Sequence, residues 1–234
     1  MDIPCSPPDK LISQREANVM PTSSSPAVAS RGDGPQGDAK HVLAALREQT
    51  RDEHQAIEQT LGLMSETLTL QAYRRTLERF HGFWQPLEAR LQQRVELREI
   101  GLDPAERAKA PLLARDLRVL DVGNPAVLPL CQEVPLVAST AAALGCMYVL
   151  EGASLGGQII SRHLGARLGI TRESGGLFFH GYGERTGEMW RAFGAAVSSF
   201  AVTTEARDEM VQAAIGTFRL LRRWCERDEP LSTA

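Results

Sequence analysis

Apolar residues recur every three or four positions over most of the chain, a spacing typical of amphipathic helices. A first helix is expected from an N-cap at Asp38 to about residue 59, and a second over 70–94. The apolar stripe of the second helix consists of Tyr73, Leu77, Phe80, Trp84, Leu87 and Leu91. No segment shows the alternating pattern of a β-strand and no repeat is found, so the pattern predicts an all-α protein.

Proline marks where the helical pattern is interrupted. No proline lies between Gln36 and Gln85 or between Leu136 and Glu229, whereas five fall within 104–135. Asp103 followed by proline predicts the start of a short helix that ends near residue 120. Further helices are expected over 136–168, 186–202 and 204–227.

The first 40 residues differ in composition from the rest of the chain. They contain six Pro, six Ser and three Gly, and the first aromatic residue is Tyr73. Such a segment buries too little apolar surface to offset the entropy of ordering it. We therefore expect a disordered tail over 1–40 and a single helical domain over 41–229, in keeping with 234 residues that are 43% hydrophobic.

Charge and cysteine content exclude several classes of function. The net charge is -3 without long blocks of one sign, so no nucleic-acid partner is expected. Cys5, Cys131, Cys146 and Cys225 lack metal-ligand spacing, which favours free thiols and a cytoplasmic location. The longest uncharged run, 134–150, has 17 residues and is rich in small side chains, so neither export nor membrane insertion is expected.

Two features could carry chemistry. His54 occupies an inward position of the first helix, where it is either a hydrogen-bonded core histidine or a metal ligand. Gly145, Gly152 and Gly156 recur at steps of seven and four on one face of a later helix. Close packing of two helices would explain these glycines. Together, however, an imidazole and a bare backbone indicate a thin slot that suits a planar macrocycle with a central metal.

The segments that hold these residues resemble a known family. Residues 46–54 are similar to the proximal helix of haem oxygenases and 148–158 to their distal helix, with weaker likeness at 80–91 and 181–193. The resemblance covers 42–227 and is greatest to the bacterial enzymes that accompany bacteriophytochromes. It implies an all-α, single-domain helical bundle that holds haem between a proximal helix and a kinked distal helix.

The resemblance also implies roles for residues on both sides of the haem. His54 would supply the axial nitrogen to the iron and would be the metal ligand. Gly152, Gly156 and Gly157 would line the opposite face, with Ser154 as a possible contact for water.

Three further residues are candidates for binding the haem propionates. Arg47 lies seven residues before His54, two turns back on the same face of the helix, and the family commonly has a basic residue there. Tyr148 matches a tyrosine that some bacterial members use for this purpose, and Arg191 is a weaker candidate. One residue departs from the pattern, because mammalian-type members have an aspartate where this chain has Ala153.

The function implied is oxidative cleavage of haem to biliverdin, CO and Fe(II), with O2 as co-substrate. No dinucleotide-binding motif is present, so electrons are expected from a separate reductase or ferredoxin. The product could supply the chromophore of a bacteriophytochrome. Ala153 leaves open a non-catalytic haem-binding carrier or sensor, and a thiaminase-like hydrolase of the same architecture is a third possibility.

Overall fold

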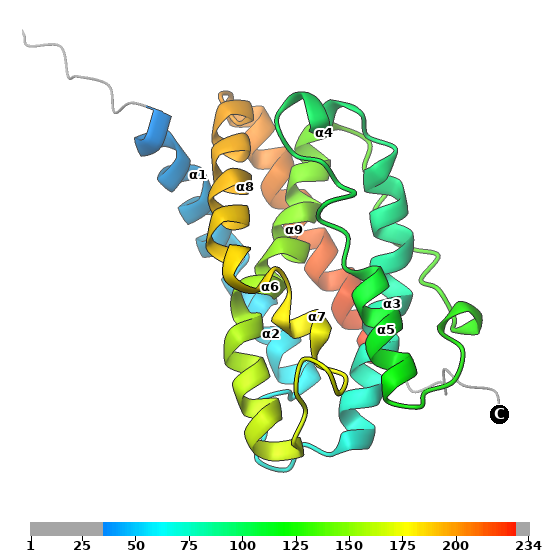
Figure 1. Cartoon of the computed structure of the whole chain (residues 1–234). Helices are drawn as coiled ribbons and strands as arrows, with labels where there is room; N and C mark the ends of the chain where they lie inside the picture. The colour runs from blue at the N-terminus through cyan, green and yellow to red at the C-terminus, as the bar shows by residue number, and fades with distance from the viewer. Residues whose placement is uncertain (1–34, 228–234) are drawn as a thin grey trace, which may run out of the picture. The chain divides into compact units, whose positions relative to one another are not determined.

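The computed structural model describes residues 35–227, with side chains from Val42 onward, and every regular element in this range is a helix (Figure 1). This confirms the all-α prediction. The elements are α1 (Pro35–Gln49), α2 (Arg51–Leu61), α3 (Leu70–Gln92), α4 (Glu96–Glu99), α5 (Ala110–Val119), η1 (Pro125–Val127), α6 (Thr140–Leu168), α7 (Leu177–His180), η2 (Gly183–Arg185), α8 (Thr186–Phe200) and α9 (Thr204–Cys225).

The predicted domain limits are only partly within the described residues. Residues 1–34 and 228–234 lie outside them, so a disordered tail over 1–34 and a domain end at 229 stay predictions. Residues 35–40, which we assigned to the tail, belong to α1, so the first helix begins before the expected N-cap at Asp38.

Side-chain caps fix the starts of the three long helices. The hydroxyls of Thr69, Ser139 and Thr203 each accept a hydrogen bond from the backbone amide three residues further on, at 3.2, 3.0 and 3.2 Å. At its other end α6 stops at Gly169, whose positive φ of 67° closes the helix. These starts lie within a few residues of the positions predicted from the sequence.

The first predicted helix is divided in two at Thr50. This residue has φ -100° and ψ 0°, and it separates α1 from α2. Its hydroxyl donates to the carbonyl oxygen of Leu46 at 2.7 Å, a back-bond that bends helices. Arg47 and His54 therefore lie on two helices, α1 and α2, and not on one uninterrupted helix, which corrects the expectation of a single first helix.

The short helix predicted after Asp103 also begins later than expected. Asp103 accepts the amide of Ala105 at 3.0 Å, but this bond closes only a turn. The helix α5 starts at Ala110, where the carboxylate of Glu88 on α3 accepts the amides of Lys109 and Ala110 at 2.8 and 3.0 Å. A cap from a distant part of the chain thus sets the start of α5.

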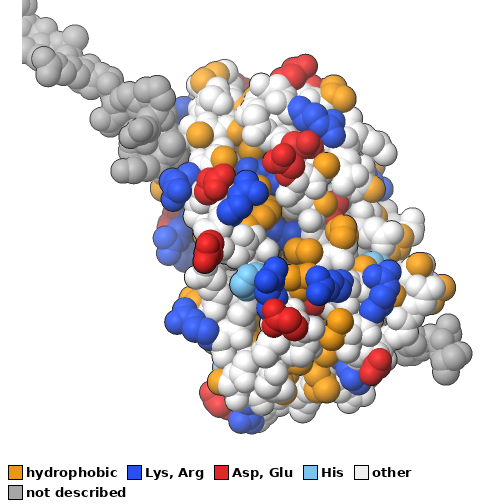
Figure 2. Space-filling view, in the orientation of Figure 1, with side chains coloured by type: hydrophobic (Ala, Val, Ile, Leu, Met, Phe, Trp, Pro, Cys, Tyr) orange, Lys and Arg blue, Asp and Glu red, His pale blue; other side chains and the backbone are white. Residues whose placement is uncertain are grey.

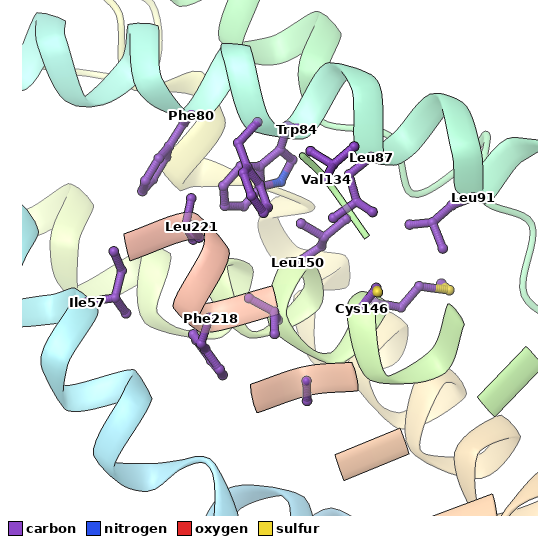
Figure 3. Packing of buried hydrophobic residues seen from close by; sticks show 14 of the residues in the cluster. Ile57, Phe80, Trp84, Leu87, Leu91, Val134, Cys146, Leu150, Phe218 and Leu221 are labelled. Carbon is purple, nitrogen blue, oxygen red and sulfur yellow. The ribbon is translucent and has the colours of Figure 1, made fainter. Parts of the chain in front are cut away.

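The helix α9 organises the hydrophobic core, because α6, α2, α1 and α3 all pack against it. In Figure 3, Leu221 of α9 lies between Ile57 of α2 and the aromatic side chains of α3. The core continues into α7, where the ring of Phe178 lies 5.5 Å from that of Trp84. The core thus extends from the buried face of α9 through α3 to α7.

Among the described helices, α6 alone is long and apolar enough to cross a membrane by length and composition. It packs along α9 inside the bundle, which accounts for its apolar character. On the face shown in Figure 2, acidic and basic side chains are interspersed, as expected for a chain with little net charge.

Candidate functional site

The candidate site lies between α2 and α6. Each of these helices packs against α9, but they make no comparable contact with each other. The helix α2 carries His54, and α6 carries the glycines singled out in the sequence. The structure thus brings the two features onto two neighbours of the same helix.

His54 is more exposed than predicted. Its side chain is 53% exposed, whereas Ile57 on the next turn takes the core position. The imidazole ring meets the ring of Phe218 on α9 edge to face, with centroids 5.6 Å apart, and its Nδ1 lies 3.7 Å from a carboxylate oxygen of Glu58. Within the described residues neither ring nitrogen has a hydrogen-bond partner. The prediction of an inward core position is wrong, and the ring is available as a ligand.

Two of the glycines of α6 face open space. A Cβ atom added to Gly152 or Gly156 would meet nothing within 4 Å. At Gly145, on the same face, an added Cβ would overlap the carbonyl oxygen of Met210 on α9. The packing alternative is therefore correct for Gly145, while Gly152 and Gly156 expose bare backbone beyond the part of α6 that α9 covers.

Gly157 and Ser154 lie away from this open face. An added Cβ at Gly157 would overlap the carbonyl oxygen of Phe179, so this glycine lets α7 pack closely against α6. Ser154 is buried beside Gly181, and its hydroxyl has no hydrogen-bond partner among the described residues. Gly157 therefore does not line the face to which it was assigned, because consecutive helix positions point in different directions.

Tyr148 lies at the junction of α1 and α2, near enough to Arg47 for the charge of the guanidinium to act on the phenol. The hydroxyl of Tyr148 is hydrogen-bonded to the side chain of Thr50. Burial raises the pKa of Tyr148, while this hydrogen bond and the positive charge of Arg47 act in the opposite direction. A guanidinium and a phenol in such proximity can bind a carboxylate. Arg191 is exposed on α8, a helix that packs against both α1 and α6, and the ring of the adjacent Trp190 lies 6.1 Å from that of Tyr148.

The sequence reasoning missed a buried charge cluster behind α6, which consists of Glu88, Arg107, Lys109, Glu151 and Tyr182. Arg107 pairs with Glu151 at 3.2 Å, and the hydroxyl of Tyr182 donates to the same carboxylate at 2.8 Å. Lys109 donates to the backbone carbonyl of Leu150 at 3.0 Å. The available signal was a glutamate that directly follows an uncharged run of 17 residues.

Two small cavities in the structure lie away from His54. One of about 10 Å³ is lined by Glu88, Arg107 and Glu151 together with apolar residues, and another of about 70 Å³ lies beside α7. In the part of the chain that the structure describes, no group of three or more His, Cys, Asp or Glu side chains could hold a metal. A single imidazole fits an iron whose other nitrogen ligands come from a macrocycle.

Comparison with known proteins identifies the family of this chain. The family model described as "Heme oxygenase" matches residues 40–227. A heme oxygenase from Xanthomonas campestris pv. campestris is 29% identical over 147 residues, which are 62% of this chain and 84% of that protein.

Three solved structures with a similar fold are also heme oxygenases. The enzyme from Neisseria meningitidis has a TM-score of 0.68 at 21% identity, with 82% of this chain and 96% of that chain covered. The enzyme from Leptospira interrogans has a TM-score of 0.67 at 21% identity, with 79% and 98% covered. A cyanobacterial enzyme from Synechocystis, solved with heme, has a TM-score of 0.63 at 16% identity, with 79% and 90% covered. The family match spans most of the sequence, and the chain belongs to the heme oxygenase family.

Proposed function

We propose that this enzyme opens the haem ring oxidatively and releases biliverdin, CO and Fe(II), with O2 as co-substrate. The observation that carries the proposal is the pairing of the exposed imidazole of His54 on α2 with the glycine face of α6 at Gly152 and Gly156. A flat iron chelate would fit here because His54 can supply a ligand to the metal, and Gly152 and Gly156 keep side chains away from the flat face of the ring.

In this proposal each residue of the site has a defined task. His54 would bind the iron through a ring nitrogen, and the bound haem would supply the iron at which O2 is activated. Gly152 and Gly156 would keep side chains out of the space beside the ring. Arg47 and Tyr148 would hold a propionate and so orient the substrate.

Proton delivery has no free carboxylate from α6 to use, because the one acidic residue of this helix, Glu151, is paired with Arg107 and Tyr182. Ala153 occupies the place of the aspartate of mammalian-type members, and Ser154 points toward Gly181. We infer that solvent water between α2 and α6 delivers the protons. We further propose a separate reductase or ferredoxin as electron donor, a bacteriophytochrome as a recipient of the product, and a cytoplasmic location.

The test is a turnover experiment on the purified full-length chain with hemin, O2 and a ferredoxin–reductase mixture. The expected result is decay of the Soret band together with growth of a biliverdin absorption, with the pigment identified by chromatography. Loss of the Soret band without any bilin would contradict the proposed reaction.

Ala153 favours one alternative, a haem-binding carrier or sensor that does not turn over its ligand. This alternative predicts a haem complex that persists under the same reducing, aerobic conditions without formation of a green pigment. The experiment above separates the two. The family assignment removes the reason for considering a thiaminase-like hydrolase.

A further inference from the structure

We propose that the buried charge cluster positions the open segment of α6, and that Lys109 is its central positioning residue. The proposal rests on the proposed function only for its purpose, which is to hold the bare backbone at a fixed distance from bound haem. Neither Lys109 nor its partners touch the open face, so none of them is a catalytic residue.

The burial of Lys109 is the first argument. Its side chain is 2% exposed, and lysine is almost never buried to this extent without partners. The ammonium donates to the carbonyl oxygen of Leu150 at 3.0 Å and lies 4.8 Å from the centre of the Tyr182 ring. A charged donor on a helix carbonyl is a strong hydrogen bond when water is excluded. The hydrogen bond to Leu150 therefore offsets part of the free-energy cost of burying Lys109, and it fixes the side chain to α6.

The remaining members of the cluster compensate the charge of Lys109 and tie it to other elements. Arg107 pairs with Glu151 of α6, which also accepts the hydroxyl of Tyr182 from the segment after α7. Glu88 of α3 accepts the backbone amide of Lys109 itself. Two acidic and two basic side chains thus join α3, the segment before α5, α6 and the end of α7. Such a set is rigid when all of its members are paired.

The place of the hydrogen bond along α6 is the second argument. Leu150 lies two residues before Gly152, and three glycines follow within 152–157. Each interior glycine lowers helix stability relative to alanine, so this segment has little stiffness of its own. A hydrogen bond at Leu150 restrains it at its N-terminal end.

A second contact restrains the other end of the same segment. Gly157 packs on the Phe179 carbonyl of α7, and α7 is in turn fixed by Asp116, which accepts the amides of Leu177 and Phe178 at 3.0 and 2.7 Å. The segment 150–157 is thus held from one side at both ends. Gly152 and Gly156 lie between these points and face open space.

The test is hydrogen exchange in the haem-free protein, which does not depend on the proposed function. Lys109→Met keeps the length and apolar stem of the side chain but removes the donor. We expect amides of residues 151–157 to exchange at least tenfold faster, while amides of α9 change less than twofold. Unchanged exchange in 151–157, or an equal increase in α9, would overturn the proposal.

A milder pair of variants decides the question if Lys109→Met does not fold. Tyr182→Phe removes the hydroxyl that binds Glu151, and Thr186→Val removes a buried hydroxyl that binds the Gly183 carbonyl in the same connection without contacting Glu151. We expect at least threefold faster exchange of 151–157 in Tyr182→Phe only. Equal effects of the two variants would contradict a specific role of the cluster.

Measurements with haem then separate this inference from the proposed function. If the wild type makes biliverdin, Lys109→Met should lower kcat at least fivefold while the hemin Kd changes less than twofold. A larger change in Kd with constant kcat would overturn the positioning role. If the wild type makes no biliverdin, the exchange result still tests the cluster.

Discussion

At the residue scale, His54 shows what an unusual position in a pattern can reveal. His54 drew attention in the sequence because it interrupts an apolar stripe, and we expected its ring to be buried in the core. In the structure the ring lies at the surface beside Phe218, and Ile57 fills the core. Leu46, Thr50 and Ile57 of the same predicted stripe are buried, so the inward face continues past Thr50 and His54 lies at its edge.

Replacing His54 tests the assignment of the iron ligand. His54→Ala removes the ring nitrogens, so the absorption spectrum of the ferric hemin complex should change and hemin affinity should fall by about tenfold, which is about 1.4 kcal/mol. His163→Ala is the control, because that ring contacts the Ser65 carbonyl at 3.2 Å. An unaltered spectrum in the His54 variant would refute axial ligation.

His81 should make folding stability depend on pH. The side chain is buried, and burial, with a contribution from Arg118, lowers the pKa of His81 below its ordinary value of 6.5. Below pH 6.5 the unfolded chain takes up a proton that the folded protein resists. The stability contributed by neutral His81 is therefore present above pH 6.5 and is lost as the pH falls through the pKa of the folded state.

The variant His81→Gln checks this effect by urea unfolding at pH 7 and pH 5. Its free energy of unfolding should fall less between these pH values than that of the wild type, by about 1.4 kcal/mol for each unit by which the pKa is lowered. His180→Gln, at an exposed histidine, should behave like the wild type. An equal fall in all three proteins would show that His81 is not responsible.

At the element scale, the periodicity of glycine in α6 was visible in the sequence, but the neighbours of each glycine were not. Gly145 and Gly152 share a face, yet α9 covers the first and leaves the second open. Helix starts with their own capping residue, such as Ser139, were predictable within a few residues. The start of α5 was not, because its cap comes from Glu88, a residue distant in sequence.

Two matched alanine variants separate packing from ligand contact on α6. Gly145→Ala should destabilise the protein by about 1–3 kcal/mol, because the new methyl group overlaps the Met210 carbonyl. Gly152→Ala should stabilise the haem-free protein by about 0.5–1 kcal/mol, since it meets no neighbour and favours the helix. Thermal unfolding measures both.

In hemin binding the order of the two variants should be reversed: the substitution that stabilises the haem-free protein should be the one that lowers hemin affinity. Gly152→Ala should weaken hemin binding, measured by titration of the Soret band, because its methyl group enters the open space. Gly145→Ala should bind hemin as the wild type does wherever it remains folded. Equal hemin affinity of Gly152→Ala and the wild type would show that Gly152 does not line the binding face.

At the scale of the whole molecule, hydrophobic periodicity was sufficient to predict the fold class, since every described element is a helix. It was not sufficient to predict that α9 is the common neighbour of the other long helices, nor that Lys109 and Glu151 share a buried cluster. Both depend on contacts between residues far apart in the chain, which periodicity within one helix does not report.

Hemin should stabilise the entire bundle, because a ligand that binds only the folded state adds to its free energy of unfolding. At a free concentration of about 100 times Kd the gain is about 2.7 kcal/mol. Thermal unfolding with and without hemin should therefore show a higher Tm for the wild type, and a smaller increase for His54→Ala. The absence of any increase in the wild type would contradict haem binding.

The packing of both α2 and α6 on α9 determines the thickness of a ligand that fits between them. Because α2 and α6 each pack on α9 and not on each other, α9 sets the distance between them. The ring of Phe218 on α9, which contacts the imidazole of His54, contributes to this distance. A shorter side chain at this buried position, as in Phe218→Leu, should let α2 move toward α9 at some cost in stability and so change the thickness of ligand that fits beside His54.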